Sequence, residues 1–231
     1  MKPPIRFIGA GGAHDLHWGN SAALVEWAGK TYLIDCGFTV YPRLSEKKLI
    51  EQVDAVCITH LHDDHIGSLS VLLYHRHFLS KLPPLPLLVG GTELQAKLYT
   101  ILHFMMGEVE RFARIMTPEE YDPHLIWVST SRQHMPHMPS AAYIFTKDRE
   151  ALIYTGDIAA PLPLLQDENW LSRYSTLYVF HDVAFHRTAT HCYYEELHPF
   201  LEKVQLWGYH CDPTTAPADN KIRLVHYELM L

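Results

Sequence analysis

The sequence predicts a single α/β domain, residues 1–231, in which two sheets pack face to face with helices on the outside. Three observations predict this fold class. The segments run strands, then helices, then strands again with one late helix. Hydrophobic residues make up 48% of the chain, which is enough to bury a large core. No short repeat or low-complexity tract interrupts the pattern, so we expect one domain.

In the first half of the chain, short apolar segments bounded by turn residues predict strands, and longer segments with helical spacing predict helices. The predicted strands cover residues 5–8, 22–27, 31–34 and 53–59, and "AGK" at 28–30 predicts a hairpin turn. The predicted helices cover residues 66–79 and 92–106. The proline-rich connector "KLPPLPLLVGG" between them has room for one short strand.

In the second half of the chain, the same patterns predict strands and one late helix. Predicted strands cover residues 125–131, 141–146, 151–155, 177–180 and 222–225, and one helix covers residues 194–204. The stretch "TKDRE" predicts a turn, and "HCDPTTAPADN" at 210–220 predicts an irregular surface loop.

The composition and net charge of the chain limit which kinds of molecule it is expected to bind. The net charge of −7 argues against a sequence-independent grip on long nucleic acid, which needs many Lys and Arg side chains facing phosphates. A small anionic ligand stays compatible if metal ions supply local positive charge. No apolar run approaches the roughly 18 residues of a membrane span, and the first residues lack the apolar core of a secretory signal. We therefore expect a cytoplasmic protein that does not bind membranes. Its four cysteines form no CxxC pair and are expected to be reduced.

Metal-capable side chains are concentrated in "ITHLHDDHIG", residues 58–67, directly after a predicted strand. His60 and His62 point the same way at a strand end and can share one ion, while the turn that follows aims Asp64 and His65 at a second. Histidine and carboxylate are suitable ligands for zinc and other first-row metals. The plain alternative is a polar surface loop, but HxHxDH after an apolar strand is a much more specific pattern than a single HxH.

This HxHxDH motif resembles the signature of the metallo-β-lactamase superfamily, and the resemblance extends along most of the chain. It implies a four-layer αβ/βα sandwich with two facing mixed sheets. Asp35 in "YLIDCG" resembles the first motif of the superfamily, in which the aspartate is mainly structural and hydrogen-bonds near a ligand histidine. Asp157 in "LIYTGD" matches the metal-bridging aspartate, and His226 in "IRLVHY" matches the last ligand.

The resemblance also implies a third ligand histidine before the next pair of strands. "RQHMPHMPSAAY" offers His134 and His137, and His134 is preferred because it directly ends the strand-like run that begins at residue 125. Sequence alone leaves the choice between the two open.

The stretch "YVFHDVAFHRTATHCYYEEL" resembles the ribonuclease Z branch, in which a strand ends in a His-Glu pair and a short loop leads to another histidine. The matching residues are His181, Asp182 and His191, with Asp182 where glutamate is usual. The resemblance implies that the acidic residue orients the histidine, which protonates the leaving oxygen or steadies the phosphate. Without the family pattern, His191 would be interpreted as a surface or helix-cap histidine.

The opening of the chain is also similar to this branch, because a Gly-rich turn at Gly11 and Gly12 precedes an Asn-Ser pair. A glycine pair alone more often marks a turn. His14 and His17 are near it and could face a substrate, although isolated histidines are usually surface residues.

A long basic arm that clamps transfer RNA is characteristic of ribonuclease Z, and only 68 residues separate Asp157 from His226 here. The chain is instead similar to the cyclic-nucleotide phosphodiesterases of this branch, including the anti-Pycsar phosphodiesterases. That resemblance implies a small phosphodiester or cyclic nucleotide as substrate and a homodimer. The segment "LYTILHFMMGEVERF", residues 98–112, could supply the dimer surface or could be a core helix.

The resemblance implies a dinuclear hydrolase that cuts a cyclic nucleotide to a linear monophosphate with a metal-activated hydroxide. Two Zn²⁺ ions, with Mn²⁺ or Fe as alternatives, would be held by two groups of three residues that share one bridging aspartate. One ion would be held by His60, His62 and His134, the other by Asp64, His65 and His226, with Asp157 bridging. The expected catalytic residues are Asp64 as proton acceptor and His191, held by Asp182, as proton donor. The alternatives are a ribonuclease Z-like RNA endonuclease, a lactonase or thioesterase, and a nucleotide-sequestering binding protein.

Overall fold

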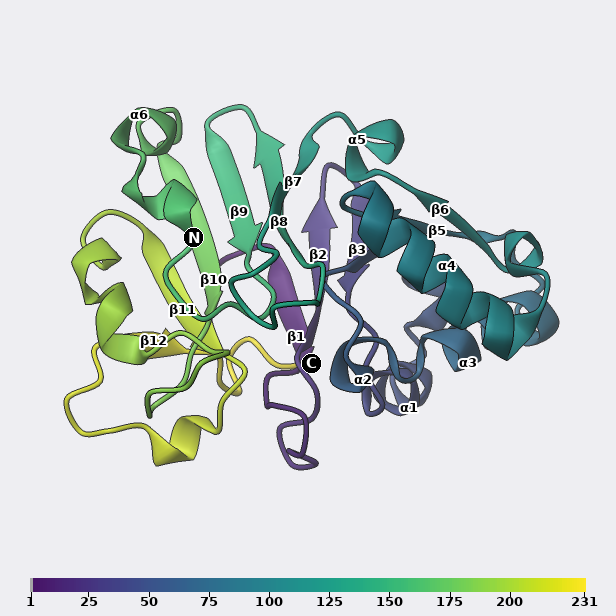
Figure 1. Ribbon diagram of the computed structural model, residues 1–231, viewed down its shortest axis with the longest axis horizontal. Helices are drawn as coiled ribbons and strands as arrows, with labels where there is room; N and C mark the ends of the chain where they lie inside the picture. The colour runs from purple at the N-terminus through teal and green to yellow at the C-terminus, as the bar shows by residue number, and fades with distance from the viewer. Residues whose placement is uncertain (1) are drawn as a thin grey trace.

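Two six-stranded mixed sheets face each other in the computed structural model, which describes residues 2–231 (Figure 1). In the first sheet the strands lie in chain order, β1 to β6: Ile5–Gly9, Ala22–Trp27, Lys30–Ile34, Ala55–Ile58, Leu85–Val89 and Ala113–Met116. Strands β1 to β3 are antiparallel, whereas β3 to β6 are parallel. The parallel strands all end at one edge of the sheet, where loop residues from several strands meet.

The second sheet repeats this arrangement. Its strands, β7 to β12, also lie in chain order: Leu125–Ser129, Ala141–Lys147, Glu150–Tyr154, Thr176–Asp182, Gln205–Tyr209 and Arg223–Leu224. Strands β7 to β9 are antiparallel and β9 to β12 are parallel. Each half of the chain therefore forms one sheet, which begins with antiparallel strands and continues with parallel strands.

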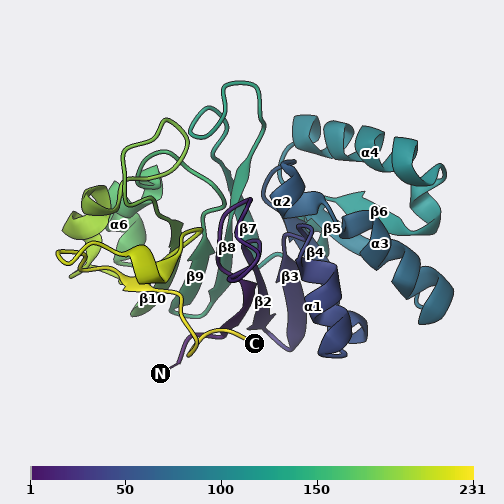
Figure 2. The same cartoon turned by 90° about the horizontal axis from the view of Figure 1, so that it is seen from below.

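Helices cover the outer face of each sheet, as Figure 2 shows from below. The α-helices α1 to α6 are Val40–Glu46, Asp63–Ile66, Leu69–Tyr74, Thr92–Met106, Pro118–Tyr121 and Glu168–Leu171. Short 3-10 helices cover Ile50–Gln52, Val109–Arg111, Pro163–Gln166, Tyr194–Phe200 and Pro213–Thr215. Helices α1 to α4 lie beyond the first sheet, and α6 lies beyond the second.

Three clusters of buried apolar side chains pack these layers against one another. The central cluster lies between the sheets and joins side chains such as Tyr32 and Cys57 to Tyr143 and Phe180. A second cluster joins the first sheet to helices α1 to α4, and a third joins the second sheet to the helical segments that follow β9 and β10. Most strands are buried on both faces, which explains why they appear as apolar runs rather than as alternating patterns. The sandwich predicted from the sequence is confirmed.

Several predicted elements differ from the structure. Of the helix predicted over 66–79, Leu69–Tyr74 forms α3 and His75–Leu79 continues it as a wider π-helical turn, while α2 ends where the prediction begins, at Ile66. The helix predicted over 194–204 is a 3-10 segment, Tyr194–Phe200, which contains Pro199. A proline inside a helix removes a backbone donor and clashes with the preceding turn, so a regular α-helix is disfavoured there. Strands β6 and β11 were not predicted, and the last strand is shorter than expected.

The longest helix, α4, has 15 residues. Within residues 2–231, no helix combines the length and the apolar character needed to cross a membrane.

Candidate metal centre

The candidate site is formed where the carboxyl ends of the parallel strands of both sheets meet. His60 and α2 follow β4, Asp157 follows β9, Asp182 ends β10, and His210 follows β11. Because loops after parallel strands collect at one edge of a sheet, residues more than a hundred positions apart become neighbours. The site therefore contains side chains from both halves of the chain.

The first donor group contains His60, His62, His134 and Asp157, whose ligand atoms lie within 4.8 Å of one another. His62 Nδ1 lies 2.9 Å from His60 Nε2 and 3.1 Å from His134 Nε2. Asp157 Oδ2 lies 3.8 Å from His60 Nε2 and 3.9 Å from His134 Nε2. Three imidazoles thus present ring nitrogens to one point, beside one carboxylate oxygen.

The second donor group contains Asp64, His65, Asp157 and His210, again within 4.8 Å of one another. Asp157 Oδ1 lies 3.4 Å from both His65 Nε2 and His210 Nδ1, and Asp64 Oδ2 lies 3.4 Å from His65 Nε2. The two oxygens of Asp157 therefore face different groups. This is the placement that a bridging carboxylate requires.

Unpaired buried atoms show that these donors fit a metal ion. His65 Nε2, Asp157 Oδ1 and His210 Nδ1 are buried and have no hydrogen-bond partner. Leaving a buried polar atom unpaired costs about 1–3 kcal/mol, and all three atoms point into the second group. A divalent cation would satisfy them together, and a set of imidazoles and carboxylates is the chemistry that zinc and other first-row metals prefer.

Asp35 fixes the orientation of two of these histidines from beneath. It accepts hydrogen bonds from the Thr59 backbone N–H (2.8 Å), the Thr59 hydroxyl (2.7 Å) and His65 Nδ1–H (2.8 Å). Since the Thr59 hydroxyl proton is directed to Asp35, Thr59 Oγ1 accepts from His60 Nδ1–H at 3.0 Å. These bonds turn Nε2 of His60 and Nε2 of His65 toward the site, and Nε2 is the atom that would bind a metal ion in place of a proton. Asp35 is buried and has a φ of 60°, a strained backbone conformation of the kind found at functional sites.

The charges of the site are strongly coupled. Burial lowers the pKa of His60 well below its usual value, and the nearby positive charge of His65 lowers it further. Burial also acts to lower the pKa of His65, but the charges of Asp157 and Asp35 raise it well above its usual value. Burial would raise the pKa of Asp157, yet His210 and His65 hold it well below its ordinary range. Asp157 is therefore ionised, and the site presents negative charge to a cation.

The position expected for His226 is filled by His210, and this is a correction to the sequence analysis. His226 is exposed, and its ring packs on Trp18 with the centroids 5.3 Å apart, outside both donor groups. It follows the two-residue edge strand β12, whereas His210 follows β11, the direct neighbour of β10. The signal for His210 was present in the sequence, because "LWGY" precedes it directly as an apolar run.

The structure separates the two candidates for the third histidine. His134 is buried and belongs to the first group, whereas His137 is exposed and offers only its backbone carbonyl, to Lys97. Of the early histidines, His14 lines the cavity beside the site, and His17 packs edge-on against Trp18.

A third group joins Asp157, Asp182 and His191. His191 Nδ1–H donates to Asp182 Oδ2 at 2.9 Å, and the Ile158 backbone N–H donates to the same oxygen at 2.9 Å. Burial acts to lower the pKa of His191, but the hydrogen bond to Asp182 and its charge outweigh burial and raise this pKa to about 9. His191 is therefore protonated at neutral pH and one quarter exposed, so it can donate a proton into the cavity.

His181, the histidine next to Asp182, does not face the cavity. It is buried, its Nε2 accepts from the Leu162 backbone N–H, and its Nδ1–H donates to the Asp182 carbonyl. Burial lowers the pKa of His181, which keeps the ring neutral in this role. It holds the loop after Asp157 against the end of β10.

A cavity of about 820 Å³ opens onto the three groups. His62, Asp64, His134, Asp157, His191 and His210 reach its wall, and the apolar side chains of Phe38, Met135 and Phe185 line it farther out. This volume is in the range of pockets that enclose small ligands. Among the described residues of the wall there are four aspartates and neither a lysine nor an arginine.

Comparisons with known proteins agree with this geometry. A family model described as "Anti-Pycsar protein Apyc1" matches residues 4–228. An anti-Pycsar protein Apyc1 of Paenibacillus harenae is 27% identical over 213 residues, which cover 87% of this chain and 86% of the relative. A ribonuclease Z of Mycolicibacterium gilvum (strain PYR-GCK) is 28% identical over 155 residues, 59% of this chain and 54% of that protein.

The fold is shared with solved structures. The crystal structure of the metallo-β-lactamase fold protein YhfI from Bacillus subtilis superposes with a TM-score of 0.70 at 17% sequence identity. The superposition covers 94% of this chain and 88% of YhfI. The predicted resemblance to the metallo-β-lactamase superfamily and its ribonuclease Z-like branch is confirmed. Together, the relatives and the histidine and aspartate groups support a metal-dependent hydrolase.

Proposed function

Because this chain belongs to the family of the anti-Pycsar protein Apyc1, we propose that it is a phosphodiesterase that opens cyclic nucleotides to linear monophosphates. One observation carries the proposal: two donor groups share Asp157, and the protonated His191 lies beside them on the same cavity wall. Hydrolysis of a phosphodiester needs an activated water on one side of phosphorus and a proton for the leaving oxygen on the other. This site can supply both.

The two donor groups would hold two divalent ions, with zinc as the first candidate. His60, His62 and His134 belong to the first, Asp64, His65 and His210 belong to the second, and Asp157 would bridge them. When bound, such ions lower the pKa of a water molecule and offset the negative charge of the phosphate.

The remaining chemistry belongs to side chains of the protein. Burial acts to raise the pKa of Asp64, but its hydrogen bond to His65 and the positive charge of that residue lower it. Asp64 is therefore ionised and can accept a proton from the attacking water. As the bond from phosphorus to the ribose oxygen breaks, His191 gives its proton to that oxygen, and Asp182 holds the ring through Nδ1.

The charge of the cavity favours a small substrate over long RNA. The chain carries a net charge of −7, and the described cavity wall has no lysine or arginine that could follow a second or third phosphate. A substrate with one phosphodiester group can be neutralised by the ions and His191 alone. A ribonuclease Z-like endonuclease is therefore the weaker alternative.

The first experiment measures metal content and substrate range together. Purified protein should contain about two metal equivalents and should convert one or more cyclic mononucleotides to linear monophosphates, with activity lost on chelation and recovered on adding zinc or manganese. Product analysis by mass spectrometry across cyclic mono- and dinucleotides identifies the substrate.

Other outcomes would identify the alternatives. Full activity after exhaustive removal of metal would refute the proposal. Turnover of lactones or thioesters without turnover of phosphodiesters would indicate a different hydrolase. A nucleotide that is bound tightly and released unchanged on denaturation would indicate a sequestering protein.

A further inference from the structure

A single hydroxyl determines the conformation of the turn that carries His191. Thr188 Oγ1 accepts hydrogen bonds from the backbone N–H groups of Thr190 (3.2 Å) and His191 (2.8 Å). The same hydroxyl donates to the His191 carbonyl at 3.2 Å. A threonine hydroxyl has one proton and two acceptor sites, so its whole hydrogen-bonding capacity is used within this turn.

The turn at 188–191 contacts the donor groups in two places. The carbonyl of Thr190 accepts a hydrogen bond from His134 Nδ1–H at 2.9 Å, and His191 Nδ1–H donates to Asp182 at 2.9 Å. The rings of His134 and His191 lie with their centroids 5.4 Å apart. One short segment therefore holds a histidine of the first donor group and the protonated histidine of the third group.

The bond to Thr190 matters for His134 because it decides which ring nitrogen is free. With Nδ1–H directed to the carbonyl, the lone pair of His134 Nε2 faces His62 and Asp157 in the first group. Partners of this kind fix the tautomer and the ring orientation of metal-binding histidines. Here the partner is a backbone carbonyl, so its position depends on the conformation of the turn.

We propose that Thr188 is a positioning residue that couples the metal affinity of the first donor group to the placement of the proton donor His191. The coupling runs through the two peptide N–H groups that Thr188 holds and the Thr190 carbonyl between them. The part that concerns His191 rests on the proposed function, whereas the part that concerns His134 requires only that the first group binds metal.

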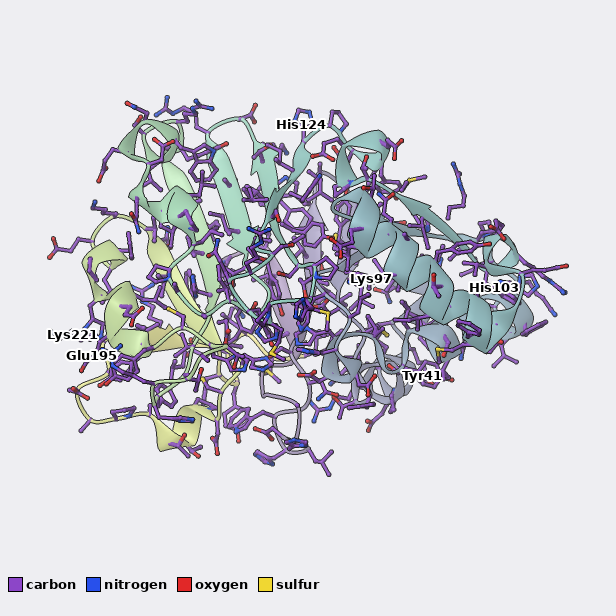
Figure 3. All side chains as sticks on the ribbon, viewed as in Figure 1. Tyr41, Lys97, His103, His124, Glu195 and Lys221 are labelled. Atoms are coloured by element: carbon purple, nitrogen blue, oxygen red, sulfur yellow. The ribbon has the colours of Figure 1, made fainter. Side chains whose placement is uncertain are left out.

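The test compares Thr188→Val, which keeps the shape of the side chain and removes the hydroxyl, with Thr188→Ser, which keeps the hydroxyl. Thr146→Val is the matched control, because the Thr146 hydroxyl also bonds a backbone carbonyl, that of His124. Thr146 pairs with Ala151 at the start of β9, at the opposite edge of the sheet from the donor groups, and Figure 3 labels His124 at that edge.

Two measurements are made on each variant: zinc affinity by competition with a chromophoric chelator, and kcat and KM for the cyclic nucleotide. Thr188→Val should weaken the affinity for one of two ions by about 10–100-fold, the usual effect of losing a partner of a ligand histidine, and should lower kcat more than it raises KM. Thr188→Ser and Thr146→Val should resemble the unmodified protein in both measurements.

Each contrary result has a distinct meaning. Unchanged zinc affinity in Thr188→Val overturns the proposal, and so does a loss of kcat alone, since coupling requires both effects. If the unmodified protein binds zinc but cuts no phosphodiester, the proposed function fails while the affinity comparison still tests Thr188. If Thr188→Val does not fold, ¹⁵N NMR of the zinc-loaded unmodified protein decides, because a His134 ring without a proton on Nδ1 would contradict the coupling.

Discussion

His210 combines an unusual backbone conformation with an unpaired ring nitrogen. Its φ is 67°, in the left-handed region that costs a residue with a side chain roughly 1–2 kcal/mol. The conformation directs Nδ1 toward Asp157, where it lies buried and without a hydrogen-bond partner. A ligand role would explain both the strained backbone and the unpaired nitrogen.

Replacing His210 should therefore remove one metal-binding position. We expect His210→Ala to lower the metal content from about two equivalents to about one and to reduce kcat by at least about 100-fold, because activation of water requires the metal pair. His226→Ala is the matched control, since its exposed ring packs on Trp18 and Tyr227, outside both donor groups. Inductively coupled plasma mass spectrometry on both variants checks this. A loss of metal in His226→Ala and not in His210→Ala would contradict the assignment.

The pair formed by Asp182 and His191 makes a prediction about pH. The pKa of His191 is raised to about 9. The protonated, proton-donating form of this ring is therefore fully populated at neutral pH and is lost as the pH rises through that value. Asp182→Asn removes the charge that raises this pKa, so the alkaline fall in kcat should move toward the ordinary value of 6.5. The profile of kcat against pH, from neutral to alkaline, measures the shift.

Asp182→Glu is the control for that experiment, because it keeps the charge and introduces the residue that is usual in the ribonuclease Z branch. In this variant, kcat should fall at nearly the same alkaline pH as in the unmodified protein. An Asp182→Asn profile that superposes on the original would show that His191 is not the group that titrates.

At the scale of elements, helix α2 is held against the end of β3 by backbone contacts. Cys36 N–H donates to the His65 carbonyl at 2.6 Å, and Ser68 N–H donates to the Cys36 carbonyl at 3.0 Å. Gly37 permits this approach, since a Cβ there would lie 1.9 Å from the Asp64 carbonyl oxygen. The helix that carries two ligand candidates is thus placed by a residue that has no side chain.

Gly37→Ala should displace α2 and the two side chains Asp64 and His65. We expect a loss of about 1–3 kcal/mol in the free energy of unfolding, as for other overpacked sites, together with weaker zinc binding. Urea unfolding and chelator competition measure the two effects. Gly29→Asn is the control, because Gly29 faces open space and asparagine tolerates its positive φ of 80°. Unchanged stability and zinc binding in Gly37→Ala would show that α2 can shift without consequence.

The sequence identifies the parts of the site that lie in one local motif. HxHxDH and the Asp157 turn follow the short apolar strands β4 and β9, and each set of residues is placed by its own neighbours along the chain. The replacement of His226 by His210 could not be predicted in this way, because no strand was predicted before His210. It depends on which strand pairs with β10, and a neighbouring strand is about 4.8 Å closer than the next one.

The strand before His210 was missed for a physical reason. Strand β11, Gln205–Tyr209, begins with a polar residue and contains Gly208, and neither favours a strand. Tertiary packing requires this glycine, because a Cβ there would lie 2.7 Å from a methyl group of Val183. Strands such as β2 and β9 were predictable because their apolar residues are continuous.

At the scale of the whole molecule, the end of α4 presents an apolar surface to solvent. Phe104 is 85% exposed and Met105 is 53% exposed, near the end of the helix that Figure 3 marks with His103. Exposed aromatic and methionine side chains are enriched in protein interfaces. The homodimer expected from the resemblance stays a prediction, and this surface is where we expect the second copy to bind.

Light scattering coupled to size exclusion tests that expectation. The unmodified protein should have the mass of two chains, and Phe104→Glu should shift it toward one, because a charge in an apolar interface is costly to bury. Leu16→Glu places the same charge at another exposed apolar residue, 78% exposed, and should leave the mass unchanged. A monomer at all concentrations would contradict the dimer.

The cavity wall contains Asp63, Asp64, Asp157 and Asp212 and, among its described residues, no lysine or arginine. Without divalent ions, a phosphate that approaches this wall meets four carboxylates, with the positive charge of His191 as the main counterweight. With ions in place, the same wall attracts it. On the proposed function, removing the divalent ions should therefore weaken binding of the nucleotide as well as stop its cleavage, so metal supply would act already at the entrance of the cavity.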